Sequence, residues 1–177
     1  GDPAMLEAAL NSLIIAFTST SLSLLLGIGA AIRLEQQQSC HTSWMTAIIL
    51  LPLVIPEILL GVALLMLFVL CQIPLGFGSM IIGHMVFNFP LTVVILRARL
   101  RKLDPAWEEA ARDLGATPWK VLTCITLPML RPAIWGAALL SFTVSLDDFV
   151  VTFFVAGPGA TRSEEHTSEL QSRPHIS

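Results

Sequence analysis

Three carboxylates lie inside strongly apolar stretches of this chain. They are Glu57, Asp147 and Asp148, and no basic residue lies deep in the same stretches to neutralise them. A charge in a membrane costs about 2.5–3.5 kcal/mol on the insertion scale, so a residue that carries one usually has a function. Because an unneutralised carboxylate can bind a cation, these three acids are the first candidates for chemistry.

Asp148 belongs to a polar pattern with helical spacing. Ser141, Ser145, Asp148 and Thr152 follow i, i+4, i+7 and i+11, which predicts one face of a helix. Phe149 adds an aromatic face, and an acid beside an aromatic ring suits an organic cation. The face either lines a substrate path, with Asp148, Asp147, Ser145 and Phe149 as its residues, or makes a polar contact between helices.

Glu57 follows two prolines in one apolar stretch, Pro52 and Pro56. Two prolines this close predict a broken or kinked helix, and in transporters such breaks tend to line the binding site. Glu57 is therefore a second candidate for the substrate path. The alternative is a carboxyl group that is protonated or bonded to a neighbouring helix.

Other catalytic chemistry has no sequence signature here. No Gly-rich phosphate loop and no nucleophile with its base is recognisable, and the three cysteines lack metal-ligand spacing. We therefore expect no catalytic residue, no metal, no cofactor in this chain and no nucleic-acid partner.

The composition predicts an all-α, polytopic transmembrane helical bundle. Of the 177 residues 54% are hydrophobic and 13% are charged, against about 25% charged in soluble domains. A span needs about 20 mostly apolar residues. Four stretches qualify as transmembrane spans: residues 10–32, 44–70, 80–96 and 132–157.

The basic residues predict the orientation. Eight precede the C-terminal tail; one, Arg33, follows the first span, and the other seven lie between the third and fourth spans. The positive-inside rule then puts both connections in the cytoplasm. The stretch from residue 104 to 128 is one of them. There Asp104 and Pro105 predict a helix start, Gly115 a stop, and Thr117 with Pro118 a second short helix.

Residues 109–128 read EAARDLGATPWKVLTCITLP, in which Glu-Ala-Ala, Gly115, Ile125 and Leu127-Pro128 have a fixed spacing. This segment resembles the EAA loop of ABC importer permeases. The resemblance implies a hairpin that docks on a separate ATPase, where ATP and magnesium are bound. The docking residues it implies are Glu108, Glu109, Ala110, Ala111, Gly115, Ile125, Leu127 and Pro128.

Two further segments, LPLVIPEILLGVALL at 51–65 and SFTVSLDDFVVTFFVAGPGAT at 141–161, are similar to the spermidine/putrescine branch of these permeases. The resemblance implies polyamine import in a bacterial inner membrane, with a type I permease fold. It also implies a second permease subunit, an extracytoplasmic binding protein and the lipid bilayer as partners. The alternatives are a permease for iron, sulfate or an amino acid, and a non-transporting membrane structural protein.

The last residues differ from the rest of the chain. Residues 162–177 are abruptly polar and have no apolar periodicity. We expect residues 1–161 to form a partial permease domain. We expect the tail to be non-native or disordered.

Overall fold

The computed structural model describes residues 3–37 and 40–148. All regular secondary structure in these ranges is helical, as predicted. The elements are α1 (Pro3–Gln36), α2 (Cys40–Val54), α3 (Glu57–Leu70), α4 (Phe77–Leu100), α5 (Ala106–Asp113), α6 (Pro118–Val121), the π-helical turn η1 (Leu122–Thr126) and α7 (Leu127–Asp147). Residues 149–177, which include Phe149, Thr152, the end of the predicted fourth span and the tail, lie outside the described ranges.

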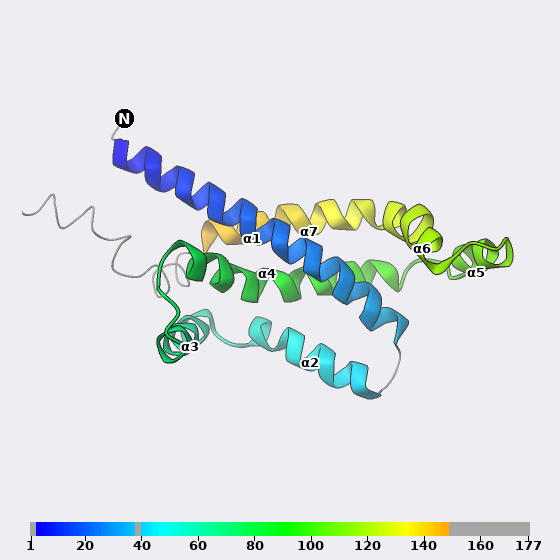
Figure 1. Cartoon of the computed structure of the whole chain (residues 1–177), viewed down its shortest axis with the longest axis horizontal. Helices are drawn as coiled ribbons and strands as arrows, with labels where there is room; N and C mark the ends of the chain where they lie inside the picture. The colour runs from blue at the N-terminus through cyan, green and yellow to red at the C-terminus, as the bar shows by residue number, and fades with distance from the viewer. Residues whose placement is uncertain (1–2, 38–39, 149–177) are drawn as a thin grey trace, which may run out of the picture.

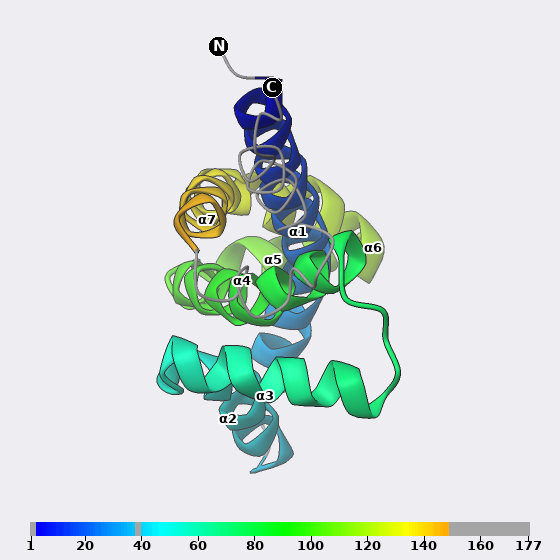
Figure 2. The ribbon, with the colours of Figure 1, turned by 90° about the vertical axis from the view of Figure 1, so that its left-hand side faces the viewer.

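Helices α1, α4 and α7 form the centre of the bundle. They run side by side along the long axis, and each contacts the other two (Figure 1). Helices α2 and α3 lie to one side of this group, as the view from the end of the bundle shows (Figure 2). Three helices are long and apolar enough to cross a membrane, over residues 10–36, 77–100 and 118–147.

The predicted span at 44–70 is not one straight helix. It consists of α2 and α3, which are bent by 108° at a short break. Pro56 lies at this break with an extended ψ of 135°, and the helical hydrogen bonds resume behind it with Leu60. The proline ring disfavours a helical conformation in the preceding residue, Ile55, which accounts for the break. If the bent pair counts as one span, the described residues hold four.

The interior of the bundle holds many polar groups beside its apolar ones, and its outer surface is apolar. Buried hydroxyl, amide and imidazole groups gather between α1, α4 and α7. They are Ser19, Thr20, Ser23, His84, Asn88, Thr92, Ser141 and Ser145. Large apolar side chains such as Phe17, Leu25 and Trp135 are 68–72% exposed. Lipid tails are as apolar as leucine, so helices in a membrane associate through small and polar residues.

The second helix of the predicted hairpin is not short. From Pro118 it continues through η1 into α7 as one helical stretch of 30 residues. The wide turn of η1 ends just before Pro128, whose ring would clash with the carbonyl of Cys124 in a regular α-helix. A π-turn is a known way to accommodate such a disturbance. The predicted boundary between hairpin and fourth span is therefore absent.

Gly27 allows α1 to approach α4 closely. A Cβ atom at Gly27 would lie 2.6 Å from Cγ2 of Thr92, whereas one at Gly29 would meet nothing within 4 Å. Thr92 is fully buried and β-branched, so its side chain has little freedom to move away. Packing thus excludes a larger side chain at Gly27 but not at Gly29, so the two positions can be compared directly.

We expect Gly27→Ala to lower the thermal stability of the purified protein in detergent. Overpacking costs about 1–3 kcal/mol, which exceeds the roughly 1 kcal/mol gained when a helical glycine becomes alanine. Gly29→Ala, the control, should leave the melting temperature unchanged or raise it. Adding Thr92→Ser, which removes Cγ2, should rescue Gly27→Ala. Equal effects of the two alanine variants would contradict the proposed close contact.

Candidate functional site

Two helix caps and a glycine turn shape the hairpin between α4 and α7. Asp104 accepts a hydrogen bond through Oδ1 from the Ala106 amide at 3.0 Å, which caps the start of α5. Thr117 accepts one through Oγ1 from the Lys120 amide at 3.4 Å, which caps the start of α6. Both caps were predicted, and both satisfy amide groups that a helix start leaves without partners.

Gly115 turns the chain between the two helices. Its φ is +80°, its amide donates to the Arg112 carbonyl at 2.9 Å, and the Ala116 amide donates to the Ala111 carbonyl at 3.0 Å. These two bonds define a Schellman motif, in which glycine is favoured because it adopts a positive φ without strain. The predicted stop at Gly115 is confirmed.

The hairpin lies at one end of the bundle, beyond the ends of α1 and α4 (Figure 1). The eight predicted docking residues differ in exposure. Glu109, Ala110 and Gly115 are exposed, whereas Glu108, Ala111, Ile125, Leu127 and Pro128 are half-buried. The structure thus brings these residues together in one hairpin, but only some of them are open to a partner.

Glu108 is half-buried and makes two contacts within the chain. Its Oε1 accepts a hydrogen bond from Oγ1 of Thr126 at 2.7 Å, and its Oε2 pairs with Nη2 of Arg112 at 3.3 Å. The first bond links α5 to the π-turn that leads into α7. Within this chain, Glu108 thus connects α5 to the turn that precedes α7.

Three large apolar side chains project from the same hairpin. Trp107 is 61% exposed, Leu114 89% and Trp119 71%. None of the three is among the docking residues predicted from the sequence. Their residue types could have marked them, because bulky apolar side chains in a hairpin at the membrane surface need a partner or the lipid interface. They extend the exposed surface made by Glu109, Ala110 and Gly115.

A cavity of about 670 Å³ separates the hairpin from the ends of α1 and α4. Its lining combines carboxylates, an arginine and apolar side chains. The lining residues are Ile32, Glu35, Gln36, Leu100, Leu103, Asp104, Pro105, Trp107, Glu108, Arg112, Pro118, Ile125, Thr126 and Met129. The hairpin is therefore attached to the bundle through α7 and not by close packing against α1 or α4.

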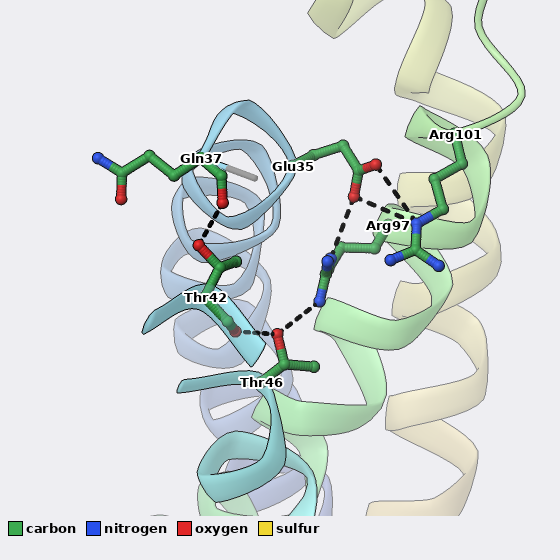
Figure 3. Close-up of polar contacts among 6 residues, drawn as sticks. All are labelled: Glu35, Gln37, Thr42, Thr46, Arg97 and Arg101. Atoms are coloured by element: carbon green, nitrogen blue, oxygen red, sulfur yellow. Dashed lines mark hydrogen bonds and ion pairs between the residues drawn. The ribbon is translucent and has the colours of Figure 1, made fainter. Parts of the chain in front are cut away.

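An ion-pair cluster ties three helix ends together beside this cavity (Figure 3). Glu35 of α1 accepts from Nε of Arg97 at 3.2 Å and from Nε of Arg101 at 3.3 Å, both of α4. Nη1 of Arg97 also donates to Oγ1 of Thr46 in α2 at 2.8 Å. Arg97 is 13% exposed and Glu35 21%, so solvent weakens this pair less than a surface pair.

Gln37 and the start of α2 are joined to the same cluster. Oγ1 of Thr46 donates to the Thr42 carbonyl at 2.7 Å, and Oγ1 of Thr42 donates to the Gln37 carbonyl (Figure 3). The chain of bonds therefore runs from the end of α1 through the start of α2 to α4.

Ser145 is buried in the contact between helices. Its Oγ lies 2.9 Å from Nδ1 of His84 and 3.3 Å from Oγ of Ser19. One turn earlier, Oγ of Ser141 lies 3.5 Å from Oγ1 of Thr92. The polar face was expected either to line a substrate path or to make a contact between helices. These contacts favour the contact between helices for Ser141 and Ser145.

The three acids lie at the end of the bundle opposite the hairpin, since α3 begins and α7 ends there (Figure 1). Glu57 is exposed in the first turn of α3, where the helix dipole favours a negative charge. Asp147 is exposed, and Asp148 is half-buried. Within residues 3–37 and 40–148, no group of three His, Cys, Asp or Glu side chains could hold a metal ion.

The chain is similar to known membrane transport proteins. The family described as binding-protein-dependent transport system inner membrane component matches residues 23–167. The chain is 42% identical over 167 residues to the putrescine transport system permease protein PotI of Escherichia coli (strain K12), covering 90% of this chain and 59% of the relative. It is 37% identical over 154 residues to the spermidine/putrescine transport system permease protein PotC of the same strain, covering 87% and 58%.

The chain thus spans less than two thirds of the length of these relatives. A solved structure described as inward facing conformations of the MetNI methionine ABC transporter contains a chain with the same fold. Its TM-score is 0.74, its identity is 18%, and the match covers 96% of this chain and 84% of that chain.

We expect Glu35→Gln to lower the free energy of unfolding by about 1–3 kcal/mol, because it leaves Arg97 and Arg101 without their shared anion. Arg101→Gln, the control, should cost no more than about 1 kcal/mol, since Arg101 is 62% exposed. Thermal unfolding of the detergent-solubilised protein measures both. Similar losses in the two variants would show that Glu35 does not hold the helix ends together.

Proposed function

Because this chain belongs to the family of binding-protein-dependent transport system inner membrane components, we propose that it forms the permease part of an ATP-driven importer for polyamines. The family resemblance predicted from residues 109–128 is confirmed by the family match. The chain is a multi-pass protein of the bacterial plasma membrane. Its role in the importer is the membrane passage, and ATP is hydrolysed by a separate chain.

The observation that carries the proposal is the hairpin of α5 and α6. It combines the Glu109-Ala110-Ala111 sequence with a tip of exposed apolar side chains at one end of the bundle. Large apolar residues that remain exposed mark a contact surface. We assign this surface to the ATPase, with Glu109, Ala110 and Gly115 at its centre and Leu114 and Trp119 beside them.

The polyamine assignment rests on charge and on the relatives. The opposite end of the bundle carries Glu57, Asp147 and Asp148, and the two Escherichia coli relatives are named for putrescine and spermidine transport. Polyamines are organic cations, which carboxylates attract. Anionic solutes such as sulfate fit these acids less well, whereas iron and amino acids stay as alternatives within the same class. The further partners we propose are a second permease subunit and an extracytoplasmic binding protein.

The docking proposal predicts that Gly115→Asp weakens copurification of the ATPase and lowers uptake at least tenfold. Asparagine and aspartate both tolerate a positive φ, so the turn should survive with either residue. Gly115→Asn is therefore the matched control for the added negative charge, and we expect it to retain more ATPase. If Gly115→Asp keeps both association and uptake, the hairpin is not the docking surface.

The substrate proposal predicts that Asp148→Asn lowers uptake of radiolabelled putrescine or spermidine in the assembled transporter about tenfold, equivalent to about 1.4 kcal/mol of lost interaction. The loss follows from removal of a negative charge that is only half-exposed. Asp147→Asn, at the more exposed neighbouring position, should have a smaller effect. Unchanged polyamine uptake in Asp148→Asn would remove this residue from the path, and uptake of iron or an amino acid instead would change the substrate class.

A further inference from the structure

The hydrogen bond between Glu108 and Thr126 belongs neither to the proposed docking surface nor to the proposed substrate path. Glu108 precedes the Glu-Ala-Ala sequence, and Thr126 lies between Ile125 and Leu127. Both therefore fall outside the spaced positions of the motif. Oγ1 of Thr126 is 2.7 Å from Oε1 of Glu108, and Thr126 is only 4% exposed. A hydrogen bond to a carboxylate at this distance is among the stronger kinds.

We propose that Glu108 and Thr126 are positioning residues that make the hairpin and α7 move as one body. This inference rests on the proposed function, in which the hairpin receives a displacement from the ATPase. The two residues would act through α7 and not by touching ATPase or substrate. Glu108 is thereby assigned a role different from that of Glu109, which is exposed on the same helix.

The surroundings of the hairpin support this assignment. The cavity of about 670 Å³ lies between the hairpin and the ends of α1 and α4, so close packing on that side does not fix α5. Gly115 connects α5 to α6 through a single turn. The Glu108–Thr126 bond spans this turn and closes a loop of 18 residues. Among the residues that the structure describes, this side-chain hydrogen bond joins α5 to the helix leading into α7.

The hydrogen bond with Glu108 meets the helix at the turn directly before α7. Thr126 is the last residue of the π-turn η1, and α7 begins with the next residue. A π-turn has a wider hydrogen-bond spacing than the α-helix around it and often lies at a functional site. A displacement of α5 would therefore act on α7 at η1, the π-helical turn within the described stretch from Pro118 to Asp147. Without the side-chain bond, α5 could pivot at Gly115 while α7 stayed in place.

The matched variants are Thr126→Val, which removes the hydroxyl and keeps the shape, and Thr126→Ser, which keeps the hydroxyl. Arg112→Gln is the control for Glu108, because it removes the exposed ion pair and leaves the bond to Thr126 intact. Each variant is reconstituted with the ATPase, the second permease subunit and the binding protein in proteoliposomes. Putrescine uptake and ATP hydrolysis are measured on the same preparation.

We expect Thr126→Val to assemble with the ATPase and hydrolyse ATP at least as fast as the wild type, but to take up at least fivefold less putrescine per ATP. Thr126→Ser and Arg112→Gln should keep the wild-type ratio. Wild-type uptake per ATP in Thr126→Val, or failure of Thr126→Ser to restore it, would overturn the inference. If the wild-type chain neither binds an ATPase nor takes up putrescine, the proposed function fails instead.

A second variant keeps the inference testable if Thr126→Val does not assemble. Glu108 is 33% exposed, so Glu108→Ala should fold, and it should lose coupling to the same extent. Where both single variants assemble, the double variant should lose no more than either, because the two residues act through one bond. Losses that multiply in the double variant, or normal coupling in Glu108→Ala, would count against a shared role.

Discussion

Polar contact between helices is the interaction on which the rest of this structure depends. Many large apolar side chains of α1, α4 and α7 face outward, and helices in lipid gain little from burying such side chains. Between the helices, hydroxyl groups and His84 lie beside buried apolar residues such as Leu96 and Leu130, and Ser145 contacts both α1 and α4. A small residue, Gly27, lets α1 come close enough for these short side chains to meet.

Local features of the structure could be predicted from the sequence, and long-range ones could not. The caps at Asp104 and Thr117 and the turn at Gly115 depend on residues a few positions apart, so their chemistry is readable in the sequence. The contacts of Ser145 with Ser19 and of Glu108 with Thr126 depend on helix packing across many residues. Periodicity can mark a polar face, but it cannot tell whether that face meets another helix or a path.

The two prolines of the second apolar stretch are another case in which the sequence predicts a local feature but not its long-range geometry. A break was expected, but its bend of 108° was not, because the angle depends on what the second half packs against. Leu60, Leu64 and Phe68 of α3 pack with Val86 and Phe87 of α4. These contacts turn α3 across the bundle, which places Glu57 at a corner and not in the middle of a span.

Helix α7 connects the end of the molecule with the proposed docking surface to the end with the acids Asp147 and Asp148. From Pro118 to Asp147 the helical stretch has 30 residues, about 45 Å at 1.5 Å per residue. A helix of this length passes on a displacement only if it is held at both ends, since otherwise it tilts or slides. One end is held to the hairpin by the bond between Thr126 and Glu108, and the other is held to α1 and α4 through Ser145. The acids Asp147 and Asp148 directly follow this second attachment. Movement of the hairpin would therefore reach the carboxylates through a contact made of hydroxyl groups and one imidazole.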